Sequence, residues 1–191
     1  VFSHLSGSEE PELDEFTRHQ ATQFIHLCTV LEQSLGYSFI KHLCNSSGIV
    51  RHPELHFDMV RLGLGLYGVD SSGTLNTQIK YVSRLRTVIS QIKRVPANET
   101  VGYNRKGILK RDTLIGTVCM GYADGIPRRL GNGIGFMSVR GVRVPIVGNV
   151  CMDMCMVDVT DIVDVQEGDE VVLFGDAISV SEIAQWAGTI P

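Results

Sequence analysis

Residues 79–95 read IKYVSRLRTVISQIKRV, and this stretch decides the fold class of the second part of the chain. Apolar and polar residues alternate along it, which is the period of a half-buried β-strand. Similar segments follow, separated by turn signals such as PANE, NG, RG and EGDE: TLIGTVCMGY, FMSVRGVRVPIVGNV, MCMVDVTDI and EVVLFG. We therefore predict an antiparallel, barrel-like β domain over residues 74–191. VSEIAQWAG should close it as a short helix that begins at Ser179 or Ser181 and ends at Gly188.

The residues before 74 show a different pattern, in which apolar strands alternate with helices. VFSHL, SFIKHLCNS and MVRLGLGLYG read as three strands, with a short polar and helical stretch near residues 52–54. Between the first two strands, one stripe at helical spacing ends at Gly36 and contains Leu13, Phe16, Gln20, Phe24, Leu27, Leu31 and Leu35.

Strands that are joined through a helix of this length pair in parallel. Three of them do not complete a parallel sheet, so we predict that residues 1–73 are a piece of a (β/α)8 barrel and that the chain begins inside a larger protein. Periodicity alone leaves an open α/β sheet as the alternative. The overall expectation is therefore α/β plus all-β, with the small, polar segment VDSSGTLN near the boundary.

Composition narrows the classes of partner. The 191 residues carry a net charge of -4, which gives no electrostatic reason to bind nucleic acid or an anionic membrane. The sequence has neither an apolar run long enough to span a bilayer nor a signal-peptide pattern at its start. The five cysteines contain no CxxC pair. We expect a cytoplasmic protein with reduced thiols.

Polar residues lie near the carboxyl ends of the three predicted parallel strands, where barrels bind ligands. His4 and Ser46 each have an ordinary structural interpretation, as a core histidine and as part of a turn. Arg61 is more informative, because a guanidinium in an apolar run must find an acceptor. The Ser46 hydroxyl and the backbone N–H groups of Gly63 and Leu64 would suit a phosphate, although the glycines could serve packing alone.

In the β domain, VGYNR, GYADGIPRR and GNVCMDMCM stand out. Tyr103 and Tyr122, taken singly, read as ordinary strand aromatics, because a tyrosine acts as a base only when its surroundings lower its pKa. Cys151 and Cys155 suggest a soft metal site. On a strand, however, they would stand roughly 13 Å apart, so we predict packing and no metal.

Taken together, these motifs resemble the alanine racemase family. FSHL, HLCNSS, DMVRLGLGLYG, VGYNR, GYADGIPRRL and VPIVGNVCMDMCMVDVTDI occur in that family's order over essentially the whole chain. The resemblance implies a pyridoxal-phosphate isomerase that interconverts L- and D-alanine. In the family, the product is a precursor for peptidoglycan synthesis. The resemblance also implies a homodimer in which the β domain reaches the partner subunit's active site. A serine racemase of the same fold and a non-catalytic dimerisation or binding module are the alternatives.

The resemblance assigns roles to the strand-end residues. Ser46 and the backbone of Gly63 and Leu64 would bind the phosphate of pyridoxal phosphate. Arg61 would donate a hydrogen bond to the pyridine nitrogen, which would stay unprotonated because arginine keeps its proton. His4 would link Arg61 to the catalytic tyrosine.

The same mapping assigns roles in the β domain. Tyr103 looks like the base that exchanges the α-proton on one face of the substrate. Tyr122 looks like a residue of the site entrance. Met152 would offer its backbone N–H to the substrate carboxylate, and Asp153 would shape that loop. Tyr122, Met152 and Asp153 would act in the site of the other subunit.

One departure from the family concerns the lysine that holds the cofactor and serves as the second base. In the family it lies in a motif like VKADAYGHG, and nothing similar occurs in this sequence. Lys41, in FIKHL, does not match that position and reads as a paired strand residue. We therefore expect part of a racemase, inactive on its own.

Overall fold

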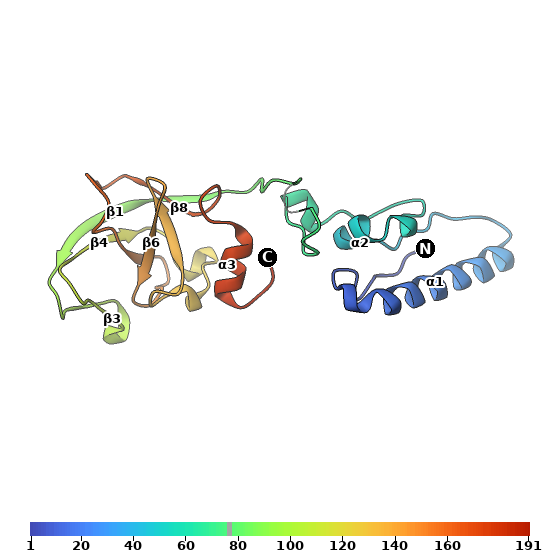
Figure 1. Ribbon diagram of the computed structural model, residues 1–191, viewed down its shortest axis with the longest axis horizontal. Coiled ribbons are helices and arrows are strands. Elements are labelled where there is room, and N and C mark those ends of the chain that lie inside the picture. Colours follow the sequence, from blue (N-terminus) through green and yellow to red (C-terminus); the bar gives the residue numbers. More distant parts are fainter. Residues whose placement is uncertain (76–77) are drawn as a thin grey trace. The chain divides into compact units, whose positions relative to one another are not determined.

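The computed structural model describes residues 1–75 and 78–191. These residues form two compact units, Val1–Val82 (unit 1) and Ser83–Pro191 (unit 2) (Figure 1). Asn76, the last residue of the VDSSGTLN segment, lies outside the described residues.

The segment before residue 83 packs on unit 1. The backbone N–H of Val82 donates to the carbonyl of Tyr67 at 3.3 Å. A Cβ atom at Gly68 would lie only 1.8 Å from the carbonyl oxygen of Lys80, so glycine permits this close approach. The division that the sequence suggests between residues 73 and 74 stays a prediction.

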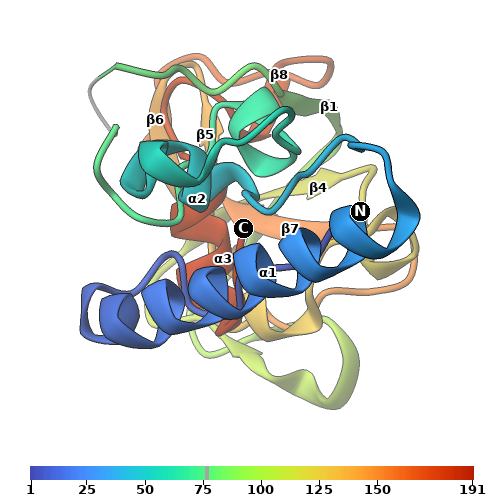
Figure 2. The same ribbon diagram turned by 90° about the vertical axis from the view of Figure 1, so that its right-hand side faces the viewer.

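The predicted long helix of unit 1 is confirmed. It is α1 (Asp14–Leu35), and it ends where Gly36 adopts a left-handed conformation with φ of 73° and donates its N–H to the Glu32 carbonyl (Figure 2). The remaining helical elements are short: η1 (Pro11–Leu13), α2 (Ser46–Arg51), η2 (Pro53–Leu55) and η3 (Leu64–Tyr67).

The prediction of three full strands in unit 1 is wrong in extent. The segments meet only through isolated parallel bridges, Phe2 with His42 and His42 with Met59. The expected parallel direction and order are present, but SFIKHLCNS turns into α2 at Ser46 and MVRLGLGLYG turns into η3. A parallel ladder gains stability from neighbours on both sides, and here only the middle segment has two.

The stripe predicted on α1 is a helix face, but unit 1 does not bury most of it. Thr17, Ala21, Phe24 and Cys28 are the buried residues of α1, and most of these side chains are small, so the helix approaches the strand segments closely. Ala21, Phe24 and Cys28 belong to a small core with Leu5, Leu43, Cys44 and Leu55. Phe24 alone is shared by the stripe and this core.

The predicted β domain is confirmed as a closed barrel. Six strands follow one another in the order β1-β4-β7-β6-β5-β8, and every pair is antiparallel. They are β1 (Leu85–Val95), β4 (Thr113–Val118), β5 (Phe136–Val139), β6 (Val142–Val147), β7 (Cys155–Asp158) and β8 (Glu170–Phe174). A separate ribbon pairs β2 (Thr100–Val101) with β3 (Gly107–Ile108). Between β5 and β6, Arg140 and Gly141 both have positive φ, as a two-residue hairpin requires.

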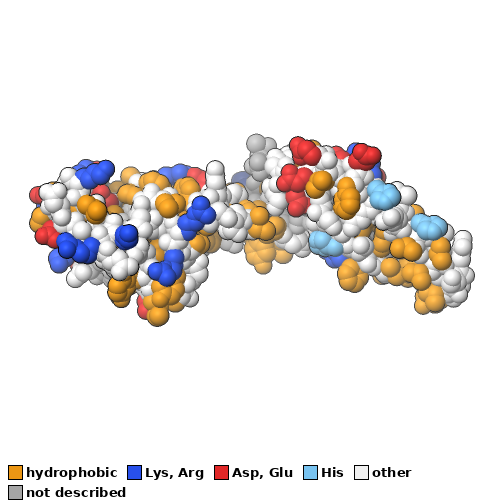
Figure 3. Space-filling view, turned by 90° about the horizontal axis from the view of Figure 1, so that it is seen from below, with side chains coloured by type: hydrophobic (Ala, Val, Ile, Leu, Met, Phe, Trp, Pro, Cys, Tyr) orange, Lys and Arg blue, Asp and Glu red, His pale blue; other side chains and the backbone are white. Residues whose placement is uncertain are grey.

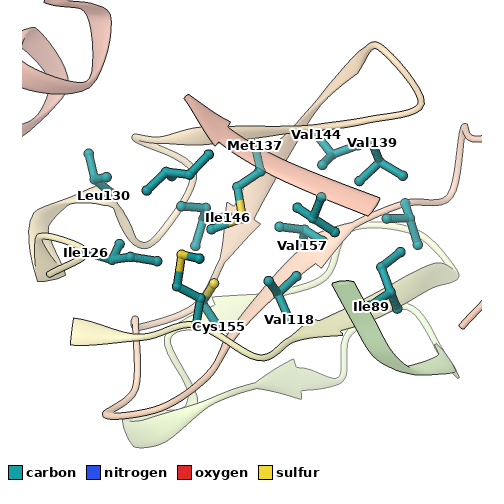
Figure 4. Close-up of a cluster of buried hydrophobic side chains, with 14 of the residues drawn as sticks. Ile89, Val118, Ile126, Leu130, Met137, Val139, Val144, Ile146, Cys155 and Val157 are labelled. Carbon is teal, nitrogen blue, oxygen red and sulfur yellow. The ribbon is translucent and has the colours of Figure 1, made fainter. Parts of the chain in front are cut away.

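The interior of this barrel is filled by apolar side chains from all six strands and from the loops after β4. Figure 4 shows Val118, Met137, Ile146 and Val157 pointing into the same space. The chain closes with α3 (Val180–Ala187), whose Ser179 hydroxyl caps the Glu182 N–H and whose Gly188 provides the left-handed stop. Both ends of this helix agree with the sequence prediction.

Candidate active site

Ser46, at the first position of α2, faces the glycine-rich segment that leads into η3. Its hydroxyl oxygen accepts the backbone N–H of Gly63 at 2.9 Å and that of Gly65 at 3.2 Å. Asn45 fixes the start of α2, because its side-chain oxygen accepts the Gly48 N–H and the Ser8 hydroxyl, each at 2.9 Å. With two bonds accepted, the Ser46 hydroxyl retains one donor proton for a ligand.

The space beside Ser46 is open because two glycines line it. A Cβ atom at Gly63 would meet nothing nearer than the Ser46 oxygen, at 3.8 Å. The backbone of Gly63 is neither helical nor extended, with φ of -115° and ψ of -96°, and it begins the turn into η3. The Leu64 N–H makes no backbone or side-chain hydrogen bond within residues 1–75 and 78–191, so it is available as a donor.

Arg61 is fixed in place by backbone carbonyls of the two neighbouring strand segments. Its Nη2 donates to the carbonyl of Ser3 at 2.7 Å and to that of Leu43 at 2.9 Å. Both bonds use the same nitrogen, so the N–H groups of Nη1 and Nε are the remaining donors of this side chain. The acceptors that the sequence demanded for a guanidinium in an apolar run are therefore present.

Two histidines accompany Arg61. The Nδ1 atom of His4 lies 3.4 Å from Arg61 Nη2, as the resemblance implies. His42 stacks on Phe2, and its Nδ1 is buried without a hydrogen bond among the described residues. Burial first, and then the positive charge of Arg61, lowers the pKa of His42 below its ordinary value, so the ring is neutral at pH 7.

In unit 2 the turn that carries Tyr122 is bonded to the loop that carries Met152. The Tyr122 N–H donates to the Cys151 carbonyl and the Ala123 N–H to the Met152 carbonyl, both at 2.9 Å. A Cβ atom at Gly121 would lie 2.2 Å from the Met152 carbonyl oxygen, so only glycine allows this contact. The Tyr122 ring itself lies against the Arg128 guanidinium.

Tyr103 lies in a loop, not in a strand. It begins η4 (Tyr103–Arg105), the turn between β2 and β3, and its side chain is 71% exposed. The two residues after it, Asn104 and Arg105, both have positive φ. The loop is therefore a strained connection that presents the phenol to solvent.

These unit 2 residues line one open cavity of about 580 Å³. Its walls are Gly102, Tyr103, Cys151, Met152, Asp153, Met154 and Met156. The structure thus brings Tyr103, Met152 and Asp153 to one surface, with Tyr122 bonded to the same loop, and it brings His4, Arg61, Ser46, Gly63 and Leu64 together in unit 1.

Lys41 and Cys155, for which the sequence analysis predicted no catalytic or metal-binding role, lie in ordinary surroundings. The Lys41 ammonium lies 2.8 Å from Glu32, and that hydrogen bond raises the pKa of the lysine, which keeps it protonated. Cys155 is enclosed in the barrel, where burial raises the pKa of its thiol to about 12. A protonated amine and a protonated thiol are both poor nucleophiles.

Comparison with known proteins follows the same division of the chain. Residues 1–71 match the family model for the alanine racemase N-terminal domain, and residues 82–191 match the model for the alanine racemase C-terminal domain. The chain belongs to the alanine racemase family. Its similarity is not limited to the motifs, since the two models together cover nearly every residue.

Relatives and a solved structure give the same family. The chain is 40% identical to the alanine racemase of Thermodesulfovibrio yellowstonii, over all of this chain and 51% of that protein. It is 37% identical to alanine racemase 1 of Caldanaerobacter subterraneus subsp. tengcongensis, over all of this chain and 50% of that protein. The alanine racemase of Bartonella henselae, solved with covalently bound pyridoxal phosphate, superposes with a TM-score of 0.88 at 33% identity, over 100% of this chain and 52% of that one.

The chain therefore spans about half the length of the alanine racemases it matches. Those relatives are isomerases by name. Among the described residues, no helix combines the length and apolar character needed to cross a membrane.

Sequence reasoning did not single out three residues that lie at these candidate sites. The sequence held a signal for His42. Residues two apart on a strand share a face, so His42 shares a face with Cys44 in one strand segment, just as Phe2 shares a face with His4 in another. Gly121 and Asn149 gave no such signal. Their roles depend on contacts with segments that are distant in sequence.

Proposed function

We propose that this chain supplies the phosphate site, the pyridine-nitrogen contact and one of the two proton-transfer bases of a pyridoxal-phosphate-dependent alanine racemase. The observation that carries the proposal is the cradle of Ser46, Gly63 and Leu64 beside a guanidinium that is already fixed by two carbonyls. In this proposal, unit 1 is the closing part of a β/α barrel, supported by its two parallel bridges and α1. Unit 2 is the domain that carries the base.

The residues of the cradle fit pyridoxal phosphate. A hydroxyl with one free proton, a free N–H and an open glycine are the neutral, small donors that a phosphate accepts closely. The covalently bound pyridoxal phosphate of the Bartonella henselae enzyme supports the same group here. When bound, the group withdraws electrons and makes the α C–H bond of an amino acid acidic enough to ionise.

Arg61 would hold the ring of the group from its nitrogen side. Arginine serves proteins as a hydrogen-bond donor and not as an acid, so Arg61 would donate a hydrogen bond without transferring a proton. Because Ser3 and Leu43 hold Nη2, the direction of the two remaining nitrogens is set before a ligand arrives. This fixed geometry lowers the entropic cost of binding.

Tyr103 would take and return the α-proton on one face of the substrate. A phenol with a pKa near 10 needs a cation or a hydrogen-bond donor to act near pH 7. The exposed phenol makes no hydrogen bond with the rest of the described chain. We assign that task to the partner subunit's Arg61 and His4, so that a homodimer completes the site.

The loop beside Tyr103 would bind the substrate. The backbone N–H of Met152 would donate to the carboxylate of alanine, Asp153 would hold the loop, and Tyr122 would border the entrance. The cavity that Tyr103, Met152 and Asp153 share supports this arrangement. The second base, a lysine in the family, would act from the opposite face of the substrate.

The test is complementation. This chain would be co-expressed with the half of the Thermodesulfovibrio yellowstonii alanine racemase that it does not match, and exchange of the alanine α-proton with deuterated water would be measured with pyridoxal phosphate present. We expect exchange and racemisation from the pair, and loss of at least a hundredfold with Tyr103→Phe, because general base catalysis contributes about that factor or more. Tyr37→Phe, an exposed tyrosine of unit 1, is the matched control.

A second experiment tests whether each active site is shared between two subunits. Chains carrying Arg61→Ala and chains carrying Tyr103→Phe would be mixed during assembly with that half. If each site takes one group from each subunit, the mixture recovers activity that neither variant has alone. A mixture as inactive as its components, with wild-type pairs active, contradicts a site shared between subunits.

A further inference from the structure

A chain of two asparagine side chains ends on the backbone of Tyr103. The amide Nδ2 of Asn149 donates to the Tyr103 carbonyl at 3.1 Å, and the Oδ1 of Asn149 accepts from Nδ2 of Asn132 at 3.0 Å. A backbone carbonyl can only accept, so the amide nitrogen of Asn149 must face it. The same requirement turns Oδ1 toward Asn132.

Asn132 is itself held firmly. It has a left-handed conformation with φ of 59°, and its N–H donates to the Gly148 carbonyl at 2.8 Å. The next residue, Gly133, donates to the Ile146 carbonyl at 2.7 Å at the end of β6. The backbone of residues 132–133 is therefore bonded to β6 and to the residue that follows it, and this fixes where the Asn132 side chain starts.

The Tyr103 loop needs such support. Asn104 and Arg105 follow Tyr103 with φ of 57° and 54°, values that cost free energy for residues with a side chain. Apart from the Asn149 bond, Arg105 ties the loop to its own ribbon, through its N–H to Gly102 and its Nε to Thr100. Neither bond connects the loop to the barrel.

Close backbone packing brings Asn149 to this position. A Cβ atom at Gly148 would lie 2.7 Å from the Val101 carbonyl oxygen, and one at Gly102 would lie 3.6 Å from the Asn149 nitrogen. The backbone of the loop after β6 therefore contacts the backbone of the β2–β3 ribbon at two places, Gly148 with Val101 and Asn149 with Gly102. Figure 1 shows β3 below the barrel strands of unit 2, in a ribbon that projects from the barrel.

We propose that Asn149 is a positioning residue for Tyr103, which it fixes through the tyrosine carbonyl, with Asn132 orienting its amide. The importance of this contact for catalysis rests on the proposed function, but the contact itself can be tested without activity. Asn149 touches no reacting atom. Its role is to keep the phenol at one place above the cavity.

The experiment uses the 191-residue chain labelled with ¹³C at the tyrosine ζ carbon. The chain has five tyrosines, and a Tyr103→Phe spectrum identifies the Tyr103 signal. Asn149→Asp keeps the acceptor and removes the donor. We expect its Tyr103 signal to shift or broaden while the other four stay, and hydrogen exchange at residues 103–108 to quicken about fivefold, since a hydrogen bond contributes roughly 1 kcal/mol.

Conservative variants separate positioning from a general loss of structure. Asn149→Gln keeps an amide donor and should restore the Tyr103 signal at least in part. Asn132→Gly keeps the left-handed backbone and should reproduce the shift more weakly, whereas Asn98→Gly, at another left-handed asparagine, should not. If Asn149→Asp does not fold, the Asn132→Gly and Asn98→Gly pair decides.

A Tyr103 signal and exchange rates that are unchanged in Asn149→Asp, or equal effects of Asn132→Gly and Asn98→Gly, overturn the proposal. Failure of the proposed function looks different. In that case Tyr103→Phe leaves the complemented racemase active, while the spectra still respond to Asn149→Asp.

Discussion

Strand segments pair in parallel in unit 1 and antiparallel in unit 2, and the two units differ in how many apolar side chains they bury. In unit 2 each barrel strand has two antiparallel neighbours, and a core of sixteen buried residues fills the interior. In unit 1 three segments meet through single parallel bridges over a core of seven. Apolar side chains remain on the surface of both units, as Figure 3 shows for one face.

The difference follows from the number of neighbours that each strand has. The six barrel strands close on one another, so each has a partner on both sides within unit 2, although only β5 and β6 are joined by a two-residue turn. A parallel strand needs a crossover and further strands on both sides. Several α1 side chains therefore stay exposed in unit 1: Phe16, Leu27, Leu31 and Leu35.

The largest effect should come from the barrel core. Ile146 in β6 is fully buried, and Ile146→Ala should lower the free energy of unfolding by about 4 kcal/mol, from lost burial and the remaining cavity. Trp186 packs against this core and is the sole tryptophan, so its fluorescence in urea reports on unit 2. Ile134→Ala, at an exposed isoleucine, should change stability by less than about 0.5 kcal/mol. Similar losses for both would mean that the barrel core is not the cooperative unit.

The two phenylalanines of α1 distinguish its packed face from its exposed stripe. Phe24 is 7% exposed and contacts Phe57, whereas Phe16 is 52% exposed. Phe24→Ala should cost about 3 kcal/mol, and Phe16→Ala under about 0.5 kcal/mol, measured by helical circular dichroism during unfolding. A Phe16→Ala loss as large as that of Phe24→Ala would show that something covers the stripe in solution.

Gly121→Ala tests the backbone contact between the Tyr122 turn and the Met152 loop. The new methyl group would lie 2.2 Å from the Met152 carbonyl, so the two loops must separate, at a cost of about 2 kcal/mol. Hydrogen exchange at Tyr122 and Ala123 should rise with it. Gly116→Ala is the control in the same unit, because this glycine lies in β4 and its Cβ atom would meet neighbours no nearer than 3.4 Å, an ordinary contact, so stability should change little.

The smallest effect is a pH dependence confined to unit 1. Burial and the charge of Arg61 lower the pKa of His42 in the folded chain, so the unfolded chain takes up the proton first. The stabilisation is present above the ordinary histidine pKa of about 6.5 and is lost as the pH falls below it. His42→Phe should weaken this loss. Unit 2, which contains no histidine, should be stable across the same range, and an equal slope in both units would contradict the assignment.

Local patterns predicted most of the fold. Alternation predicted all six barrel strands, the RG pair predicted the β5–β6 hairpin, and Gly36 and Gly188 predicted two helix ends. The extent of the strands in unit 1 could not be predicted, because it depends on neighbours and not on the strand's own residues. The role of Asn149 could not be predicted for a similar reason, since Tyr103, whose carbonyl it contacts, lies 46 positions away in the sequence.

The assignment of a site to these residues stays a prediction, although the sequence indicated some of the contacts that they make. Arg61 was identified from the cost of burying a charge, and its acceptors on Ser3 and Leu43 are where that argument required them. Ser46 and Gly63 were identified as a weak phosphate pattern, and their mutual hydrogen bond could not be read from spacing. The roles of Tyr103 and Met152 remain predictions from family resemblance.

The central claim is that Ser46 and the Gly63–Leu64 backbone receive a phosphate. The most direct measurement is calorimetric binding of pyridoxine 5′-phosphate and of pyridoxine to the 191-residue chain, since neither has an aldehyde that could react with lysines. We predict that the phosphate ester binds at least tenfold more tightly and that Ser46→Ala removes most of that difference, because charge-assisted hydrogen bonds contribute about 1.5–3 kcal/mol. Equal affinity for the two compounds, or a preference that Ser46→Ala leaves intact, would contradict the claim.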